Sequence, residues 1–318
     1  MTATSPYRAV IAAAYGGPDV LEVVELPASD PGEGQVLVEV RAAGVNPADW
    51  KLYTGAFGTD PARLPRRLGF EASGVVLAVG PGVNGVAPGD VVIVQPAQGA
   101  YAEQVVAPVG AVLPKPSALS WEQAAGLLLA GTTAWHTVVA AQVGPGDTVL
   151  VHGAAGGVGG FVTQLAALRG ARVIGTASAA RHDDVSAAGA EPVVYGPGLV
   201  DRVRALLDDG EVVTAAIDTV GTDEALDTSV ELVADRARIV SIAGFARGGE
   251  LGIRLLGSGP GADPGTEVRR SARAELIALA AAGRLTITVA ATYPLASVAD
   301  AHRAGMAGHT HGKIVLVP

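Results

Sequence analysis

The sequence predicts an α/β protein of two domains, and three observations lead to this prediction. Residues 1–100 carry short apolar segments separated by Gly and Pro turns, a pattern typical of a compact, mostly β domain. From Trp121 onward, helical and strand patterns alternate, which indicates parallel strands with right-handed crossovers and hence a doubly wound sheet. A glycine-rich turn at residues 152–160 connects one of these strands to the next helix.

Composition narrows the possible functions. With 318 residues, 49% of them hydrophobic, the chain can bury a large core without disulfides. It has no Cys, which excludes thiolate metal sites and thiol nucleophiles and fits a reducing cytoplasm. The net charge of −9 includes no basic block, so we expect no nucleic-acid partner. The apolar run at residues 9–14 is too short for a signal segment or a membrane span, so we expect a soluble cytoplasmic protein.

Secondary structure is expected in two blocks. The strands of the β domain are expected at residues 9–14, 35–43, 73–79 and 90–94. The alternating block is expected to begin with a helix over residues 121–141 and to continue with a helix over residues 161–169. Its strands are expected at residues 148–151, 172–176, 192–195, 213–218 and 237–242.

The segment Gly244–Gly265 interrupts the alternation. Because it is rich in Gly and Pro, we expect a mobile loop there. After it we expect a helix over residues 267–282, a strand over residues 285–291, a short helix, and a terminal strand over residues 313–317.

The glycine-rich turn has the context that a dinucleotide-binding fingerprint requires, between an apolar strand and a helix. In its spacing Ala154-x-Gly156-x-x-Gly159, the central glycine lets the backbone approach a pyrophosphate, and Gly159 allows the helix to pack closely on the strand. The helix N-terminus then faces the phosphate charge. The expected cofactor contacts of the turn are Ala155, Gly156, Gly157, Val158 and Gly159.

Several motifs, in order along nearly the whole chain, resemble the zinc-independent, NADPH-dependent quinone oxidoreductases of the medium-chain dehydrogenase/reductase superfamily. Besides the glycine-rich turn they are Gly16–Glu22, Gly44–Lys51, Leu68–Gly74, Gly99–Glu103 and Gly131–Ala134. The resemblance implies a GroES-like, mostly β domain built from residues 1–123 and 256–318, and a Rossmann domain of residues 124–255. It also implies an active site in the cleft between the domains, and a homodimer that joins two Rossmann sheets edge to edge.

Two positions within these motifs bear on the chemistry. Alcohol dehydrogenases of the superfamily hold a catalytic zinc with a Cys and a His where this chain has Asn46 and Phe70. The resemblance therefore implies no metal. An ordinary carbonyl needs a Lewis acid or a proton donor before hydride adds to it. A quinone or a conjugated enone spreads the added charge, so positioning and desolvation suffice.

These observations predict an NADPH-dependent enzyme that transfers hydride to a quinone. Two alternatives stay open at this point. One is an ene-reductase that acts on conjugated enones or alkenals. The other is a non-catalytic NADPH-binding protein that responds to redox state.

The preference for NADPH follows from the end of the second expected strand. An NAD site generally has an acidic residue about 20 residues beyond the glycine loop, where this chain has Thr176-Ala-Ser178. The expected partners of the 2′-phosphate are Ser178, Arg181 and Tyr195. Related quinone reductases often have a Lys one turn into the next helix, where this chain has Arg181-His182. This departure is expected to weaken the selectivity for NADPH over NADH.

By resemblance, Asn46 and Thr133 lie near the nicotinamide, and Lys51 is a candidate for the cleft. The expected cofactor-binding residues there also include Thr219, Ile242, Ala243 and Gly244. Two of these assignments have a structural alternative: Asn46 precedes Pro47 and fits a turn, and Thr133 fits a helix cap or packing position. Asp49 and Glu71 are expected to anchor the loop and the cleft rather than to exchange protons.

Two further residue patterns, one around Tyr53 and Phe57 and one at His309-x-His311, indicate other chemistry only weakly. Enoyl-thioester reductases of the superfamily commonly use a Tyr where this chain has Phe57, so a thioester substrate is disfavoured unless a shifted loop brings Tyr53 into use. The pair His309-x-His311 has the residue types of metal ligands, but a flexible approach to the final strand is the favoured interpretation.

Overall fold

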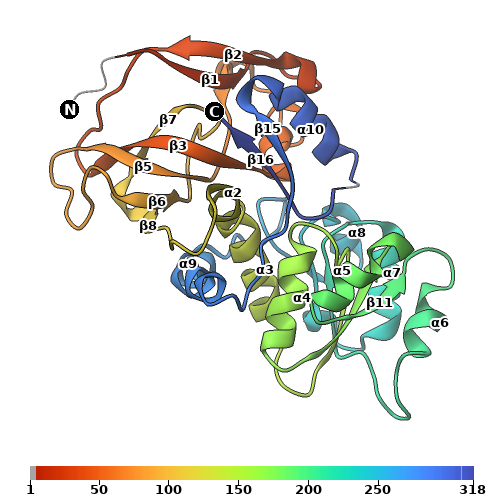
Figure 1. Cartoon of the computed structure of the whole chain (residues 1–318). Coiled ribbons are helices and arrows are strands. Elements are labelled where there is room, and N and C mark those ends of the chain that lie inside the picture. The colour runs from red at the N-terminus through yellow and green to blue at the C-terminus, as the bar shows by residue number, and fades with distance from the viewer. Residues whose placement is uncertain (1–4, 309) are drawn as a thin grey trace. The chain divides into compact units, whose positions relative to one another are not determined.

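The computed structural model describes residues 5–308 and 310–318. The chain divides into two compact units (Figure 1), one formed by the chain up to Leu129 together with Ile277–Pro318, and the other by Ala130–Leu276. The resemblance implies boundaries after residues 123 and 255. The two compact units instead meet after Leu129 and after Leu276. Among the helices of the described residues, none combines the length and the apolar composition that crossing a bilayer requires.

The first unit contains two β-sheets. A small antiparallel sheet has the order β2 (Leu21–Leu26), β1 (Tyr7–Ala12), β4 (Arg66–Arg67). The larger sheet has the order β15 (Val289–Pro294), β16 (Lys313–Val317), β3 (Gln35–Val45), β5 (Ala72–Val79), β6 (Val91–Val94), β8 (Val112–Pro114), and β7 (Gln104–Pro108) also pairs with β3. Its helices are α1 (Pro47–Tyr53), α2 (Trp121–Ala125) and α10 (Val298–Met306).

The C-terminal strands complete the larger sheet. β16 pairs antiparallel with β3, with Ile314 opposite Val45, and Figure 1 shows these blue strands beside the orange β3. This confirms that the GroES-like domain is built from both ends of the chain. Its core gathers apolar side chains from both parts, including Leu68, Tyr101 and Leu316.

The second unit contains one parallel sheet in the order β11 (Glu191–Val194), β10 (Arg172–Ala177), β9 (Thr148–His152), β12 (Ala215–Asp218), β13 (Ile239–Ser241), β14 (Arg254–Leu255). The helices between these strands are α4 (Gly159–Leu168), α5 (His182–Ala187), α6 (Leu199–Arg204), α7 (Asp223–Leu232) and α8 (Phe245–Glu250). Two longer helices, α3 (Leu128–Ala140) and α9 (Thr266–Ala281), contain the positions where the chain passes between units. β9 is buried along its whole length, as a central strand of a doubly wound sheet must be, which confirms the predicted Rossmann class.

Three expected elements were wrong in detail. The helix over residues 121–141 is two helices, because Gly126 ends α2 and its N–H bonds to the carbonyls of Glu122 and Gln123. The segment expected as a mobile loop contains α8 and β14, and β14 extends the sheet by pairing Arg254 with Val240. The strand expected at residues 285–291 is β15, which begins later because Leu285 N–H still bonds to the Leu279 carbonyl at the end of α9.

Candidate active site

The glycine-rich turn leaves β9 at Gly153, whose φ of +76° favours glycine. Gly153 N–H donates to Thr176 Oγ1 at 3.0 Å, and Ala154 N–H donates to the Thr176 carbonyl at 3.0 Å. The turn is therefore fastened to the neighbouring strand β10.

Close backbone packing explains the other glycines of the turn. A Cβ at Gly159 would stand 2.0 Å from the Gly153 carbonyl oxygen, and one at Gly156 would stand 3.2 Å from the same atom. Gly159 is also the first residue of α4, so the missing side chain is what lets the helix begin against the turn. The backbone is thus left bare where a pyrophosphate would approach the helix N-terminus.

Three sequence-predicted residues share the same edge of the sheet. Ala177 pairs with Val194 at the ends of β10 and β11, so Ser178 and Tyr195 both follow directly from paired residues. Tyr195 is 56% exposed. Arg181 lies one turn beyond Ser178. Its Nη1 is 3.6 Å from Asp184 Oδ2, and much of its side chain is exposed to solvent. The structure therefore places a cation and two hydroxyl groups at the strand ends beside the glycine-rich turn.

Thr219 is held at the end of β12. Its hydroxyl donates to the His152 carbonyl at 2.7 Å, which ties the end of β12 to the end of β9. The Thr219 side chain therefore stabilises the sheet at the edge where the glycine-rich turn follows β9.

The backbone of residues 242–244 is fixed by a buried pair that the sequence did not single out. Ser241 Oγ donates to Asp218 Oδ2 at 2.6 Å and accepts from the N–H groups of Ala243 and Gly244 at 3.2 and 3.0 Å. Asp218 also accepts from Val220 N–H at 3.0 Å. The sequence feature that could have identified this pair is an Asp at the end of an apolar strand. A carboxylate buried there needs hydrogen-bond donors from the neighbouring backbone.

Thr133 lies on α3 and is buried. Arg269, in the first turn of α9, donates from Nη1 to Thr133 Oγ1 at 3.2 Å and from Nε to His136 Nδ1 at 3.4 Å. His136 Nε2 lies 3.4 Å from Asp263 Oδ2. Burial, and then the charge of Arg269, lower the pKa of His136. No local pattern pointed to Arg269, because it is 136 residues from Thr133 along the chain.

Asn46 lies at the N-terminus of α1, as its position before Pro47 suggests, and is buried. Its Nδ2 donates to the Gly44 carbonyl at 3.2 Å and to Glu71 Oε1 at 3.0 Å. Its Oδ1 accepts from Lys313 Nζ. Lys313, which sequence analysis missed, is buried at the first residue of β16, and the approach to β3 brings it to Asn46.

Glu71 and Asp49 are anchors, as expected. Glu71 Oε2 accepts from Leu129 N–H at 2.7 Å, and its Oε1 lies 3.2 Å from Lys313 Nζ. Asp49 accepts from the N–H groups of Asn46 and Gly69 at 2.9 and 3.0 Å. Burial raises the pKa of Asp49 to about 7, against the effect of its hydrogen bonds. Lys51 lies on α1 beyond Asp49 and is partly exposed.

Tyr53 is not available as a proton donor. It is fully buried, with its hydroxyl 2.8 Å from His302 Nδ1 and its ring stacked on the His302 ring. Burial raises the pKa of Tyr53 well above its usual value. The loop shift that would have brought Tyr53 into use is therefore contradicted.

Of the pair His309-x-His311, which has the residue types of metal ligands, His309 lies outside the described residues. Within residues 5–308 and 310–318, no three His, Asp or Glu side chains converge as metal ligands would.

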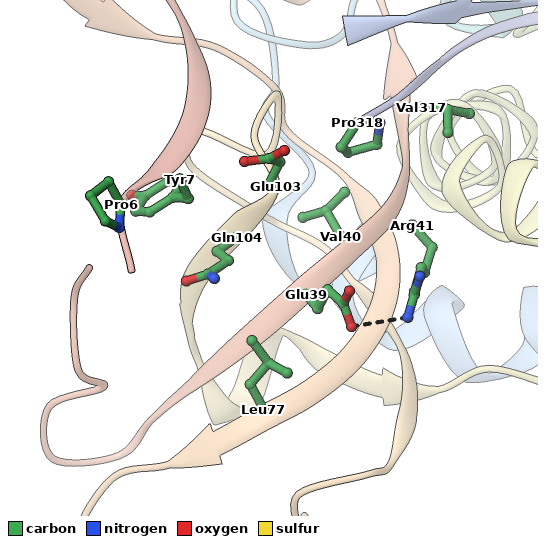
Figure 2. Close-up of a pocket in the computed structure, with 10 residues that line it drawn as sticks. All are labelled: Pro6, Tyr7, Glu39, Val40, Arg41, Leu77, Glu103, Gln104, Val317 and Pro318. Carbon is green, nitrogen blue, oxygen red and sulfur yellow. Dashed lines mark hydrogen bonds and ion pairs between the residues drawn. The ribbon is translucent and has the colours of Figure 1, made fainter. Parts of the chain in front are cut away.

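The first unit contains a pocket of about 440 Å³, whose lining residues are drawn in Figure 2. None of the sequence-predicted site residues lines it. Its carboxylates are already paired, Glu39 with Arg41 at 3.0 Å and Glu103 with Arg8 at 2.7 Å.

Comparisons with known proteins agree with this architecture. The model of the alcohol dehydrogenase GroES-like domain family matches residues 32–117, and that of the zinc-binding dehydrogenase family matches residues 188–316. Quinone oxidoreductase 1 of Escherichia coli is 34% identical over 96% of this chain and 97% of its own length.

Solved structures give the same result. A structure of Escherichia coli quinone oxidoreductase complexed with NADPH has a TM-score of 0.85 and 31% identity, covering 98% of this chain and 100% of the other. A structure of an NAD-dependent alcohol dehydrogenase has a TM-score of 0.86 and 34% identity, covering 98% and 99%. The chain belongs to the quinone oxidoreductase family of the medium-chain dehydrogenase/reductase superfamily.

Proposed function

We propose that this protein is an NADPH-dependent oxidoreductase that transfers hydride to a quinone without zinc. The observation that carries the proposal is the glycine-rich turn between β9 and α4, where a side chain at Gly159 would collide with the backbone. Such a turn leaves room for a dinucleotide pyrophosphate at a helix N-terminus. Full-length similarity to quinone oxidoreductases, one of them complexed with NADPH, supports the same cofactor and acceptor class.

The residues present fit NADPH. In the proposal, the backbone of residues 155–159 holds the pyrophosphate, and Ser178, Arg181 and Tyr195 hold the 2′-phosphate. No carboxylate stands in the first three positions after β10 to repel that phosphate. Thr219 and the backbone of residues 242–244 face the nicotinamide end. When bound, the cofactor supplies the hydride.

The absence of zinc in the proposal is supported by Asn46 and Phe70. Asn46 stands where a metal ligand would be expected, but its amide is engaged by Gly44, Glu71 and Lys313. Phe70 has no atom that binds a metal. A quinone spreads the added negative charge over a conjugated system, so its reduction does not require a Lewis acid.

The chain's own residues are proposed to orient the reactants and exclude water. Asn46, Lys51 and Thr133 are assigned to the reacting end of the cofactor. The one proton that completes the hydroquinone after hydride transfer is drawn from solvent, because Tyr53 is buried and Phe57 has no hydroxyl. Uptake of one hydride and one proton by the quinone balances oxidation of the cofactor.

We also propose a cytoplasmic homodimer, with Rossmann sheets joined edge to edge. The support is family resemblance together with a sheet that ends at the two-residue strand β14. Sedimentation analysis tests the assembly, and a monomeric mass would contradict it.

The deciding experiment is anaerobic NADPH oxidation with matched quinones, enones and alkenals, with NADH as the cofactor control. We expect rapid turnover with quinones, no dependence on added zinc, and unchanged activity after chelation. Selective turnover of enones or alkenals would make the protein an ene-reductase. Tight NADPH binding without turnover of any acceptor would support the non-catalytic alternative, and loss of activity on chelation would contradict the zinc-free assignment.

A further inference from the structure

The short loop of residues 195–198, which follows β11, is held by Arg202 of α6. Arg202 Nε donates to the Val194 carbonyl at 3.0 Å, Nη2 to the Gly196 carbonyl at 2.7 Å and Nη1 to the Pro197 carbonyl at 2.8 Å. All three guanidinium nitrogens are therefore used on one short stretch of backbone. The planar fork of a guanidinium suits such multiple contacts, whereas an ammonium offers a single nitrogen.

The charge of Arg202 is not paired with a carboxylate. Within residues 5–308 and 310–318, the hydrogen-bond partners of its guanidinium are these backbone carbonyls. Arg204, two residues further along α6, instead pairs with Glu231 at 3.0 Å. Because Arg202 directs its donors to the 195–198 loop, its role lies in the shape of that loop.

A second side chain holds the same loop from the first turn of α7. Glu224 Oε2 accepts from Gly196 N–H at 3.1 Å. The peptide group before Tyr195 is thus fixed by Arg202, through the Val194 carbonyl, and the peptide group after Tyr195 is fixed by Glu224. Because each peptide group is planar, fixing both determines the backbone dihedrals of Tyr195 and the direction of its Cα–Cβ bond.

The loop needs this support because its own sequence leaves it free. Gly196 and Gly198 have φ values of +101° and +82°, and a glycine backbone has many other accessible conformations. The Tyr195 side chain is 56% exposed, so packing alone does not orient it. Two charged side chains from neighbouring helices therefore determine the direction in which an exposed Tyr leaves the sheet.

Tyr195 stands at the edge of the sheet that a bound dinucleotide would approach with its adenosine ribose. In a doubly wound sheet the ribose lies at the end of the second strand, which here is β10. Ala177, the last residue of β10, pairs with Val194 of β11, so Tyr195 follows directly beside that end. A phenol hydroxyl can donate a hydrogen bond to a phosphate oxygen, provided that the backbone holds it within reach.

We propose that Arg202 and Glu224 are positioning residues that hold the Tyr195 hydroxyl toward the 2′-phosphate, and that they thereby set the preference for NADPH over NADH. The proposal rests on the function proposed above and deepens it. It differs from a purely electrostatic role in the sign of the effect at Glu224. Removing a negative charge near the phosphate would tighten NADPH binding by charge alone, whereas releasing the loop weakens it.

The test measures dissociation constants of NADPH and NADH by fluorescence titration. We expect Tyr195→Phe to weaken NADPH binding about tenfold, the size of one hydrogen bond to a charged group, Arg202→Met about fivefold and Glu224→Ala about threefold. NADH has no 2′-phosphate, so its binding should stay within about twofold of wild type in each variant. In the Tyr195→Phe background, Arg202→Met should change the ratio of the two constants by less than about twofold, because a positioning residue has no effect once the hydroxyl is gone.

Arg204→Met is the matched control. It removes a guanidinium from the same helix, but one that pairs with Glu231 at the surface and not with the 195–198 loop. Both cofactors should bind this variant within about twofold of wild type.

Glu224→Ala decides the matter if Arg202→Met does not fold, because it releases the loop and leaves the Arg202 contacts in place. Tighter NADPH binding in Glu224→Ala, or an unchanged preference in folded Arg202→Met, overturns this inference alone. So do additive losses from Arg202→Met and Tyr195→Phe, and so does equal weakening of both cofactors, which is what a merely structural role would produce. A wild type that binds NADH as tightly as NADPH overturns the assigned phosphate partners with it, and a wild type that binds neither overturns the proposed function as well.

Discussion

The carbonyl oxygen of Gly153 lies 2.0 Å from the position that a Cβ at Gly159 would occupy. Gly153 ends the strand side of the turn, and Gly159 begins α4, so the two residues determine how closely the helix approaches the sheet. The atoms nearest to such a Cβ belong to the backbone of Gly153 and Ala154. No flexible side chain could move away to relieve the clash.

Gly159→Ala is therefore expected to abolish measurable cofactor binding and to lower the unfolding free energy by about 1–3 kcal/mol, the usual cost of overpacking. Gly160→Ala is the control, because a Cβ there meets its nearest atom, the Ala154 carbonyl oxygen, at 3.7 Å. Titration with NADPH and chemical denaturation measure the two effects. Wild-type affinity in Gly159→Ala would contradict the role of this glycine.

The preference for NADPH should depend on Arg181. Its side chain is 42% exposed and pairs with Asp184 at 3.6 Å, so it reaches solvent beside the end of β10. We expect Arg181→Ala to weaken NADPH binding about tenfold and to leave NADH binding unchanged, because only NADPH has the 2′-phosphate.

Arg204→Ala is a suitable control for Arg181→Ala, since Arg204 is an exposed Arg of the same unit paired with Glu231 at 3.0 Å. Calorimetric titration with both cofactors gives the comparison. Equal losses for NADPH and NADH would remove Arg181 from the phosphate site.

Arg269 should act through Thr133. Because its guanidinium donates to the Thr133 hydroxyl, Arg269→Met and Thr133→Val remove the same contact from opposite ends. We expect each to lower kcat/KM, and the double variant to fall short of the sum by about 0.5–3 kcal/mol of coupling. Additive effects in steady-state kinetics would show that the two residues act independently.

Stability should depend on pH through His302. Burial lowers the pKa of His302 from 6.5 to about 4, so between these values the unfolded chain binds a proton that the folded chain does not. The contribution of His302 is present above pH 6.5 and is lost as the pH falls through 4. We expect the unfolding free energy of wild type, relative to His302→Phe, to fall by about 3 kcal/mol over this range.

Tyr53→Phe is the control for the pH experiment, because it keeps His302 buried while removing one of its hydrogen-bond partners. Its pH slope should match that of wild type, although its stability is lower throughout. Urea denaturation at several pH values measures the slopes. A slope that persists in His302→Phe would assign it to other groups, such as His152, whose pKa burial also lowers to about 4.

Local pattern was sufficient for much of the fold. The terminal strand at residues 313–317 and the strand that precedes the glycine-rich turn were predicted closely, because an apolar run bounded by turn residues is a strong signal. The segment at residues 244–265 was not, because its glycines lower intrinsic helix propensity and α8 depends on contacts with the sheet. Gly248, for example, packs closely against Leu255 of β14. A Cβ added at Gly248 would lie only 2.7 Å from the Leu255 side chain.

The same division holds for the site. The sequence alone determined the glycine-rich turn, the missing carboxylate after β10 and the Asn and Phe at positions 46 and 70, because each is a matter of residue type at a fixed spacing. Only the tertiary structure decided which partners these residues have. Lys313 reaches Asn46 through the antiparallel pairing of β16 with β3, and Arg269 reaches Thr133 through the packing of α9 near α3. Such contacts depend on long-range closure of the chain, which no local spacing encodes.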